Sequence, residues 1–123
     1  MAVPILRQGT NLIASVQSNL TDSEWLQLQE SLLRQVGEQR IQGVIIDVAA
    51  LDVLDSFATR ILRSMWQVLK LRGAETVMVG IQPEVAYAMV QLGLIGRLSG
   101  MLTALDLDDG LALLKRSLEN RGR

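Results

Sequence analysis

Two short runs of β-branched and other apolar residues, at 43–48 (GVIIDV) and 75–80 (ETVMVG), place the tightest limit on how this chain can fold. A strand with one face in water alternates between apolar and polar residues, whereas these runs are nearly continuous. Continuous runs are typical of strands that are covered on both faces of a sheet. A helical pattern follows each run, so the sequence favours a sheet with helices packed against it.

Apolar residues at spacings of three and four predict amphipathic helices around these strands. The first helix begins at Thr21, which forms a capping-box pattern with Glu24, and we expect it to end near Gly37. The second begins at the Asp55-Ser56 pair and extends to about residue 71. The expected inner faces are Trp25, Leu28, Leu32, Leu33 and Val36 in the first helix, and Phe57, Ile61, Met65 and Val68 in the second.

The two ends of the chain continue this alternation. Residues 3–6 and 11–16 predict a β-hairpin, and residues 101–105 predict a last strand. Pro83 suits the first turn of a third helix that Gly93 could end, and a fourth helix opens near Asp106 before a frayed tail at 121–123. Their expected inner faces are Val85, Met89 and Leu92 in the third helix, and Leu111, Leu114 and Leu118 in the fourth.

The resulting order, β-β-α-β-α-β-α-β-α, predicts a single α/β domain over residues 1–123. Its length suits one hydrophobic core. The N-terminus carries no signal-peptide pattern, and the longest apolar runs fall far short of the ~20 residues that span a bilayer. We therefore expect a cytoplasmic protein that makes no membrane contact.

Residue types that the sequence lacks argue against several functional classes. No His and no Cys occur among the 123 residues, which removes the usual neutral-pH base, the thiolate nucleophile and the commonest metal ligands. No phosphate-binding loop motif is present. With 12 basic and 13 acidic residues, no excess positive charge is available for nucleic acid. We expect no enzymatic activity, no cofactor, no metal and no nucleic-acid partner.

Ser56 admits two interpretations. As part of the Asp55-Ser56 pair it is an ordinary helix cap, the more frequent role for such residues. On a helical wheel, however, Ser56, Arg60, Arg63 and Gln67 fall together opposite the buried side. A phosphate on Ser56 would meet free N–H groups and the positive end of the helix dipole, with the Arg60 side chain leaning back toward it.

Trp66 lies toward the polar side of the same helical wheel, beside Thr59, Arg63 and Lys70. Trp and Arg are common anchors of protein interfaces. A Trp can also lie half-buried without any partner. The sequence leaves both interpretations of Trp66 open.

The order and spacing of several short motifs resemble those of STAS domains, the family of bacterial anti-sigma-factor antagonists. More narrowly, the chain resembles the small stressosome scaffold subunit of the RsbS type, which consists of a STAS domain alone. Each motif is weak by itself, but together they cover nearly the whole chain. The matching stretches are residues 43–47 (GVIID), 54–57 (LDSF), 73–77 (GAETV), 80–85 (GIQPEV), 92–93 (LG), 103–107 (TALDL) and 110–111 (GL).

The resemblance implies a mixed β-sheet flanked by about four α-helices, with Ser56 as the phosphoacceptor. The unphosphorylated protein would hold a serine/threonine switch kinase within a homo-oligomeric and hetero-oligomeric shell that includes a larger STAS-containing partner. Phosphorylation would release the kinase, and a phosphatase would reset Ser56. On this hypothesis the surface that contacts partners comprises Asp55, Thr59, Arg60, Arg63 and Trp66.

Three alternatives remain open. A stand-alone anti-sigma-factor antagonist of the same fold would form no shell. A ligand-sensing STAS module would use the apolar loops around residues 93–100 to line a small pocket. An enzyme with an unrecognised site fits least well with the absence of His and Cys.

Overall fold

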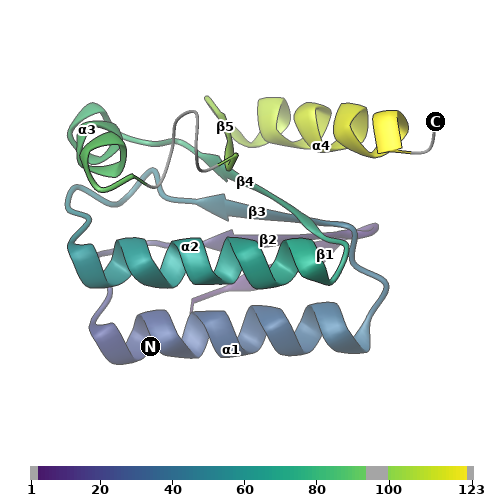
Figure 1. The fold of residues 1–123 in the computed structure, drawn as a ribbon, viewed down its shortest axis with the longest axis horizontal. Helices are drawn as coiled ribbons and strands as arrows, with labels where there is room; N and C mark the ends of the chain where they lie inside the picture. The colour runs from purple at the N-terminus through teal and green to yellow at the C-terminus, as the bar shows by residue number, and fades with distance from the viewer. Residues whose placement is uncertain (1–2, 94–99, 122–123) are drawn as a thin grey trace.

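The computed structural model describes residues 3–93 and 100–121, and the elements within these ranges follow the predicted order. The two N-terminal strands form the predicted antiparallel hairpin, and the other neighbours in the sheet pair in parallel, in the order β1-β2-β3-β4-β5. The sheet is therefore mixed, as predicted (Figure 1). The elements are β1 (Ile5–Gln8), β2 (Asn11–Ser15), α1 (Asp22–Glu38), β3 (Gly43–Asp47), α2 (Ser56–Leu71), β4 (Glu75–Val79), α3 (Pro83–Gln91), β5 (Leu102–Ala104) and α4 (Leu107–Arg121).

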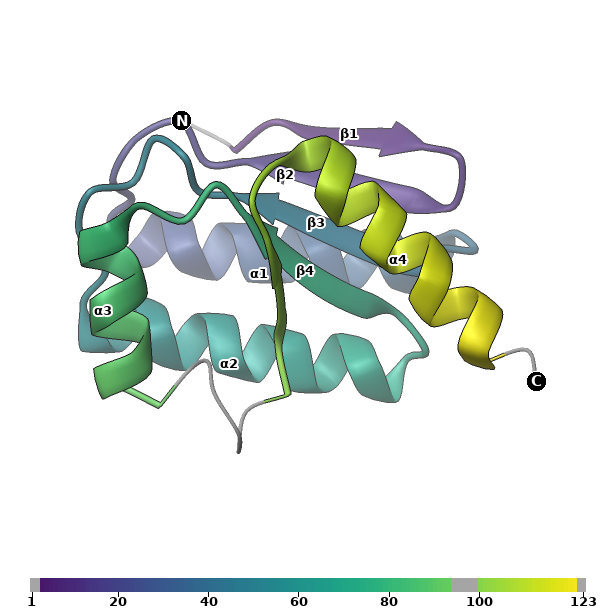
Figure 2. The same cartoon turned by 90° about the horizontal axis from the view of Figure 1, so that it is seen from above.

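Helices cover both faces of the sheet (Figure 2). The helices α1 and α2 pack side by side on one face, and α4 crosses the other. Successive residues of β3 divide between the two layers, since Val44 and Ile46 join the core under α1 and α2, while Ile45 packs with Leu114 of α4. This alternation explains the continuous apolar run in β3, because both of its faces are buried.

The close approach of α4 to the sheet depends on Gly110, which is buried in the first turns of that helix. A Cβ atom at Gly110 would lie 2.7 Å from Cγ1 of Val79 in β4. The missing side chain therefore lets α4 settle directly on β4, where it buries Leu114 completely. The predicted inner face of α4 is confirmed, with Leu111 and Leu118 half-buried beside Leu114.

Several predicted boundaries were wrong. The first strand is Ile5–Gln8, because its pairing with β2 continues to the turn. The helix α1 continues past Gly37 to a C-cap at Gln39. Leu92 is 39% exposed, because α3 has already ended at Gln91. Arg121 belongs to α4 and donates a hydrogen bond to the carbonyl of Gly73, whereas the rest of the predicted tail lies outside the described residues.

The inner face of α2 is rotated relative to the prediction. Among the four predicted residues, Met65 alone is fully buried, whereas Phe57, Ile61 and Val68 are half-buried on one flank. The buried residues of α2 are Ala58, Thr59, Leu62, Met65 and Leu69. The helix α2 packs against both α1 and the sheet. The position of these two neighbours therefore determines which residues of its wide apolar arc are buried.

Within residues 3–93 and 100–121, no helix combines the length and the hydropathy needed to cross a membrane.

Candidate site at the start of helix α2

Asp55 is the N-cap of α2. Its backbone is extended, and its Oδ1 accepts a hydrogen bond of 2.8 Å from the backbone N–H of Ala58. The Asp55 carbonyl accepts two further bonds from Thr59, one from the backbone N–H at 3.0 Å and one from the hydroxyl at 2.9 Å. Asp55 therefore performs the capping that sequence reasoning divided between Asp55 and Ser56.

Ser56 is the first residue of α2 and is exposed. Its hydroxyl makes no hydrogen bond within the described residues, since Asp55 supplies the side-chain cap. The first N–H groups of a helix have no carbonyl partner within that helix, and Asp55 occupies one of them, that of Ala58. An uncommitted hydroxyl thus stands beside free backbone donors at the positive end of the helix dipole.

The loop that leads from β3 to Ser56 is fastened on both sides. Asn19, in the loop after β2, donates through Nδ2 to Oδ1 of Asp52 at 2.9 Å. Gln82, in the loop after β4, donates through Nε2 to the carbonyl of Ala49 at 2.8 Å. Asp47 accepts the N–H of Ala49 at 3.0 Å. The loops that follow three adjacent parallel strands therefore support one another at the carboxyl edge of the sheet, where open α/β sheets commonly bind ligands and partners.

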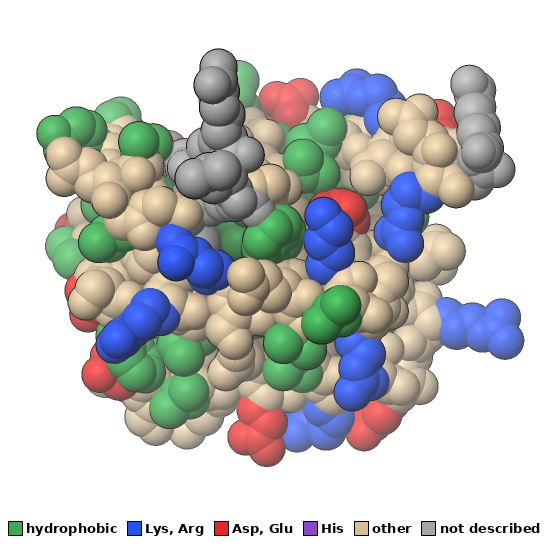
Figure 3. Space-filling view, viewed as in Figure 1, with side chains coloured by type: hydrophobic (Ala, Val, Ile, Leu, Met, Phe, Trp, Pro, Cys, Tyr) green, Lys and Arg blue, Asp and Glu red, His purple; other side chains and the backbone are tan. Residues whose placement is uncertain are grey.

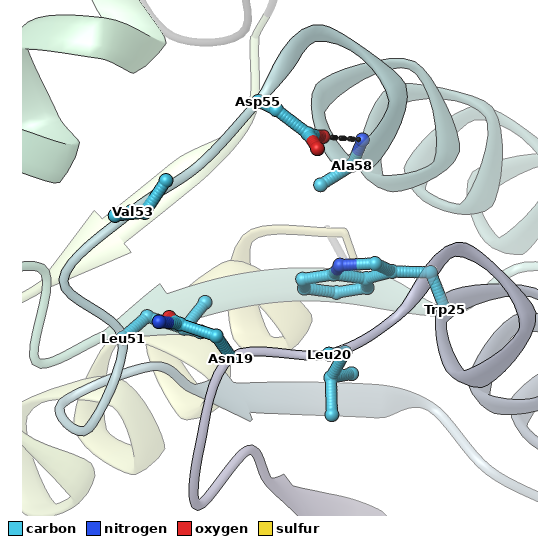
Figure 4. Close-up of a pocket in the computed structure, with 7 residues that line it drawn as sticks. All are labelled: Asn19, Leu20, Trp25, Leu51, Val53, Asp55 and Ala58. Atoms are coloured by element: carbon cyan, nitrogen blue, oxygen red, sulfur yellow. Dashed lines mark hydrogen bonds between the residues drawn. The ribbon is translucent and has the colours of Figure 1, made fainter.

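A hollow of about 210 Å³ lies next to this helix start, between the loop and the first turn of α1 (Figure 4). Trp25 of α1 lines it and is 3% exposed. Val53 lines it from the loop and is 62% exposed. The residues that surround it are Asn19, Leu20, Trp25, Leu51, Val53, Asp55 and Ala58. The hollow gives the surface beside Ser56 a partly apolar character.

The outer face of α2 beyond Ser56 carries cations. Arg60 and Lys70 are exposed, and Gln67 between them is exposed as well, as the helical wheel predicted. Arg63 is half-buried and donates through Nη2 to the carbonyl of Leu92 at 2.9 Å. The guanidinium of Arg63 therefore ties α2 to the end of α3, whereas Arg60 makes no hydrogen bond or ion pair within the described residues.

Thr59 does not lie on this surface. Its side chain is 3% exposed, and its hydroxyl bonds to the Asp55 carbonyl. In this conformation it cannot contact a partner, contrary to the prediction. Its position follows from the rotated inner face of α2.

Trp66 lies half-buried against the core on the flank of α2. Its ring holds the Lys70 ammonium 5.3 Å from the ring centroid, and a Cβ at Gly100 would be 3.3 Å from its Cζ2. The indole Nε1 is buried and finds no hydrogen-bond partner within the described residues. These contacts give Trp66 a packing role. The apolar loops considered for a ligand pocket lie, at residues 94–99, outside the described residues.

Within the described ranges, no group of three or more acidic side chains gathers in a way that could hold a metal ion. The sequence placed Asp55, Ser56 and Arg60 at the start of α2, as the structure does, but gave no indication of the contacts of Asn19 and Gln82. Each of these two residues contacts a loop 33 positions away in the chain, and a local sequence pattern carries no signal for such a contact.

Known proteins resemble this chain in both sequence and fold. A family model described as "STAS domain" matches residues 2–109. A structure of RsbS from Moorella thermoacetica, in a serine-to-glutamate variant, is 34% identical with a TM-score of 0.83 and covers 95% of this chain and 97% of that chain. A chain from a structure titled "Molecular architecture of the stressosome, a signal integration and transduction hub" is also 34% identical, with a TM-score of 0.76 and coverage of 94% and 98%.

Curated relatives from Bacillus subtilis (strain 168) are longer proteins. RsbRA, named an RsbT co-antagonist protein, is 28% identical over 112 residues, which is 90% of this chain and 40% of that protein. RsbRC, another RsbT co-antagonist protein, is 33% identical over 67 residues, which is 54% of this chain and 24% of that protein. The chain thus spans less than half the length of these relatives.

Proposed function

The chain belongs to the STAS domain family, and from that premise we propose that it is a regulatory protein that holds a serine/threonine switch kinase and releases it when Ser56 is phosphorylated. The observation that carries this proposal is the division of roles at the start of α2. Asp55 caps the helix, so the exposed Ser56 hydroxyl has no structural role that phosphorylation would disturb. The kinase would transfer the γ-phosphoryl group of ATP to Ser56 Oγ, which loses its proton, and ADP would leave.

The similar proteins support the proposed function. Two structures of similar length carry the names RsbS and stressosome, and the curated relatives are named co-antagonists of RsbT. We infer that the present chain is a non-catalytic subunit of a comparable cytoplasmic assembly, joined by a larger STAS-containing partner and reset by a phosphatase. A serine-to-glutamate variant such as that RsbS structure carries a negative charge in place of a hydroxyl, as phosphorylation would.

The mechanism follows from charge. A phosphate adds about 1.5 to 2 negative charges near neutral pH. The surface around Ser56 includes Val53 and the neighbouring hollow. This surface would contact the kinase while the Ser56 side chain is unphosphorylated and neutral. A phosphate on that surface must be desolvated, or must face like charge, when the kinase docks, and both changes weaken the complex.

The experiment is a phosphorylation assay with the purified protein, ATP, magnesium and the switch kinase from the same genome, followed by mass spectrometry. We expect phosphate on Ser56 and none in Ser56→Ala, which should still capture the kinase. Ser56→Asp should capture it less well. If a kinase that is active on another substrate leaves Ser56 unmodified, the proposal is wrong and Ser56 is an ordinary first residue of a helix.

A size measurement separates this proposal from the stand-alone antagonist of the same fold. We expect a large particle by light scattering when the protein is mixed with its larger STAS partner. A monomer or dimer in that mixture would favour the stand-alone antagonist.

A further inference from the structure

The helix that carries Ser56 has an unusual charge pattern. Within α2, Arg60, Arg63 and Lys70 are cationic, and none of its residues is acidic. The chain as a whole has a net charge of −1, so this helix departs in sign from the rest of the molecule. In Figure 3, basic side chains (blue) lie over α2, including the half of the helix that begins at Ser56.

The three cations of α2 differ in what they already contact. Arg63 is bonded to the carbonyl of Leu92, and Lys70 lies over the ring of Trp66. Arg60 is exposed and makes neither a hydrogen bond nor an ion pair within residues 3–93 and 100–121. Arg60 is therefore the cation of α2 that is free to take a new partner.

Arg60 is also the cation within reach of Ser56. Residues four apart on a helix are neighbours on its surface, with Cβ atoms about 5–6 Å apart. Helical side chains lean toward the N-terminus, which brings the Arg60 guanidinium back over the first turn. Arg63 lies about 10 Å further along the helix axis than Ser56 and is held away by its bond to Leu92.

We propose that Arg60 exchanges ion-pair partners: it pairs with a carboxylate on an acidic surface of the kinase while Ser56 is unmodified, and with the Ser56 phosphate afterwards. This inference rests on the proposed function and specifies the chemistry of the partner. Phosphorylation would then act twice, by adding negative charge to the docking surface and by withdrawing the cation that the kinase uses. Charge complementarity indicates an acidic kinase surface as the partner of α2, because this helix has cationic residues and no acidic ones.

The first test measures the affinity of the kinase for the full chain with Arg60→Gln. The matched control is Arg116→Gln, which removes an exposed arginine from α4 on the opposite face of the sheet. We expect Arg60→Gln to weaken binding by about tenfold and to reduce its dependence on salt, because one ion pair is lost. We expect Arg116→Gln to bind as wild type does. In protein already phosphorylated on Ser56, Arg60→Gln should cause little further loss, because the arginine has been withdrawn.

Either of two results would overturn the exchange. The first is that Arg60→Gln binds the kinase as tightly as wild type does, and the second is that it weakens binding equally in both states of Ser56. If unmodified wild-type protein fails to bind the kinase at all, the proposed function falls and Arg60 loses its first partner.

The second test does not depend on the kinase. Phosphoserine is installed at position 56 during synthesis of the chain, and the pKa of its phosphate is followed by ³¹P NMR. A nearby guanidinium favours the dianion, so Arg60→Gln should raise the pKa of the phosphate whereas Arg116→Gln should leave it unchanged. An unchanged phosphate pKa in Arg60→Gln would show that Arg60 does not pair with the phosphate.

Discussion

The side chain of Asn19 donates a hydrogen bond of 2.9 Å to Asp52 and so joins two loops that are 33 residues apart in the chain. On the other side of the Asp52 loop, Gln82 bonds to the carbonyl of Ala49. Both contacts act on the same short segment, which leads from β3 into the helix that begins at Ser56. The two neighbouring loops thereby add to the bonds within the segment itself, such as that from the N–H of Leu51 to the carbonyl of Val48.

Loss of either contact should loosen this segment. We expect Asn19→Ala and Gln82→Ala each to lower the free energy of unfolding by about 1 kcal/mol or less, because each removes one exposed hydrogen bond. Amide hydrogen exchange over residues 48–54 should become faster in both variants. Gln91→Ala is the control, since it removes an exposed bond to Tyr87 in α3. Equal protection of residues 48–54 in all the proteins would contradict the support that we assign to the two loops.

A negative charge should be tolerated at Ser56 but not at Thr59. Ser56 is exposed at the start of α2, where the helix dipole favours an anion, so we expect Ser56→Glu to change the free energy of unfolding by less than about 0.5 kcal/mol. Thr59 is 3% exposed, and Thr59→Glu should cost at least about 3 kcal/mol by burying a charge without a partner. Urea denaturation measures both values. A folded Thr59→Glu of wild-type stability would show that Thr59 is accessible after all.

Asp55 should matter for stability through its side-chain cap. We expect Asp55→Ala to lower the free energy of unfolding by about 1 kcal/mol, because the N–H of Ala58 loses its acceptor. Asp55→Asn keeps a capping oxygen and should cost less. Thermal or urea unfolding of the three proteins gives the comparison. If the alanine and asparagine variants were equally stable, the cap would not contribute as we infer.

The free energy of unfolding at acidic pH should depend on Glu24. Hydrogen bonds from Thr21, first from its backbone N–H and then from its hydroxyl, lower the pKa of Glu24 from its ordinary value of 4.5. A carboxyl group with a lowered pKa stabilises the fold above the unfolded-state pKa, and that stabilisation is lost as the pH falls through the folded-state pKa.

Unfolding measured at a series of pH values below 5 should therefore show a steeper loss of stability in wild type than in Glu24→Gln, which cannot titrate at this position. Thr21→Ala removes the hydroxyl of the capping box and should also flatten the slope. Parallel slopes in the three proteins would show that the capping box does not shift this titration.

The order of the elements could be predicted from sequence because strands and helices follow different local periods. The start of α2 was found for the same reason, since Asp55 is a strong N-cap residue next to an apolar helical pattern. Ser56 and Arg60 fall on the exposed face as the helical wheel required. The role of Ser56 as a phosphoacceptor stays a prediction that came from family resemblance.

The inner face of α2 could not be centred from its sequence. Apolar residues occupy a wide arc of this helix, from Phe57 on one flank to Leu62 and Leu69 at the centre. Any stripe within that arc satisfies the helical period, and the packing of α1 and the sheet selects among them. The packing that is selected also buries Thr59, which the sequence placed near the surface.

The fastening of the Ser56 loop by Asn19 and Gln82 has a consequence for how an assembly of such subunits would respond. On the proposed function, a loop that is already held in place would not refold when Ser56 is modified, so each copy would switch without altering the copies beside it. The number of kinase molecules retained would then fall in step with the number of serines modified. Such an assembly would count phosphorylation events one by one, and its output would follow the dose of the signal as a graded curve.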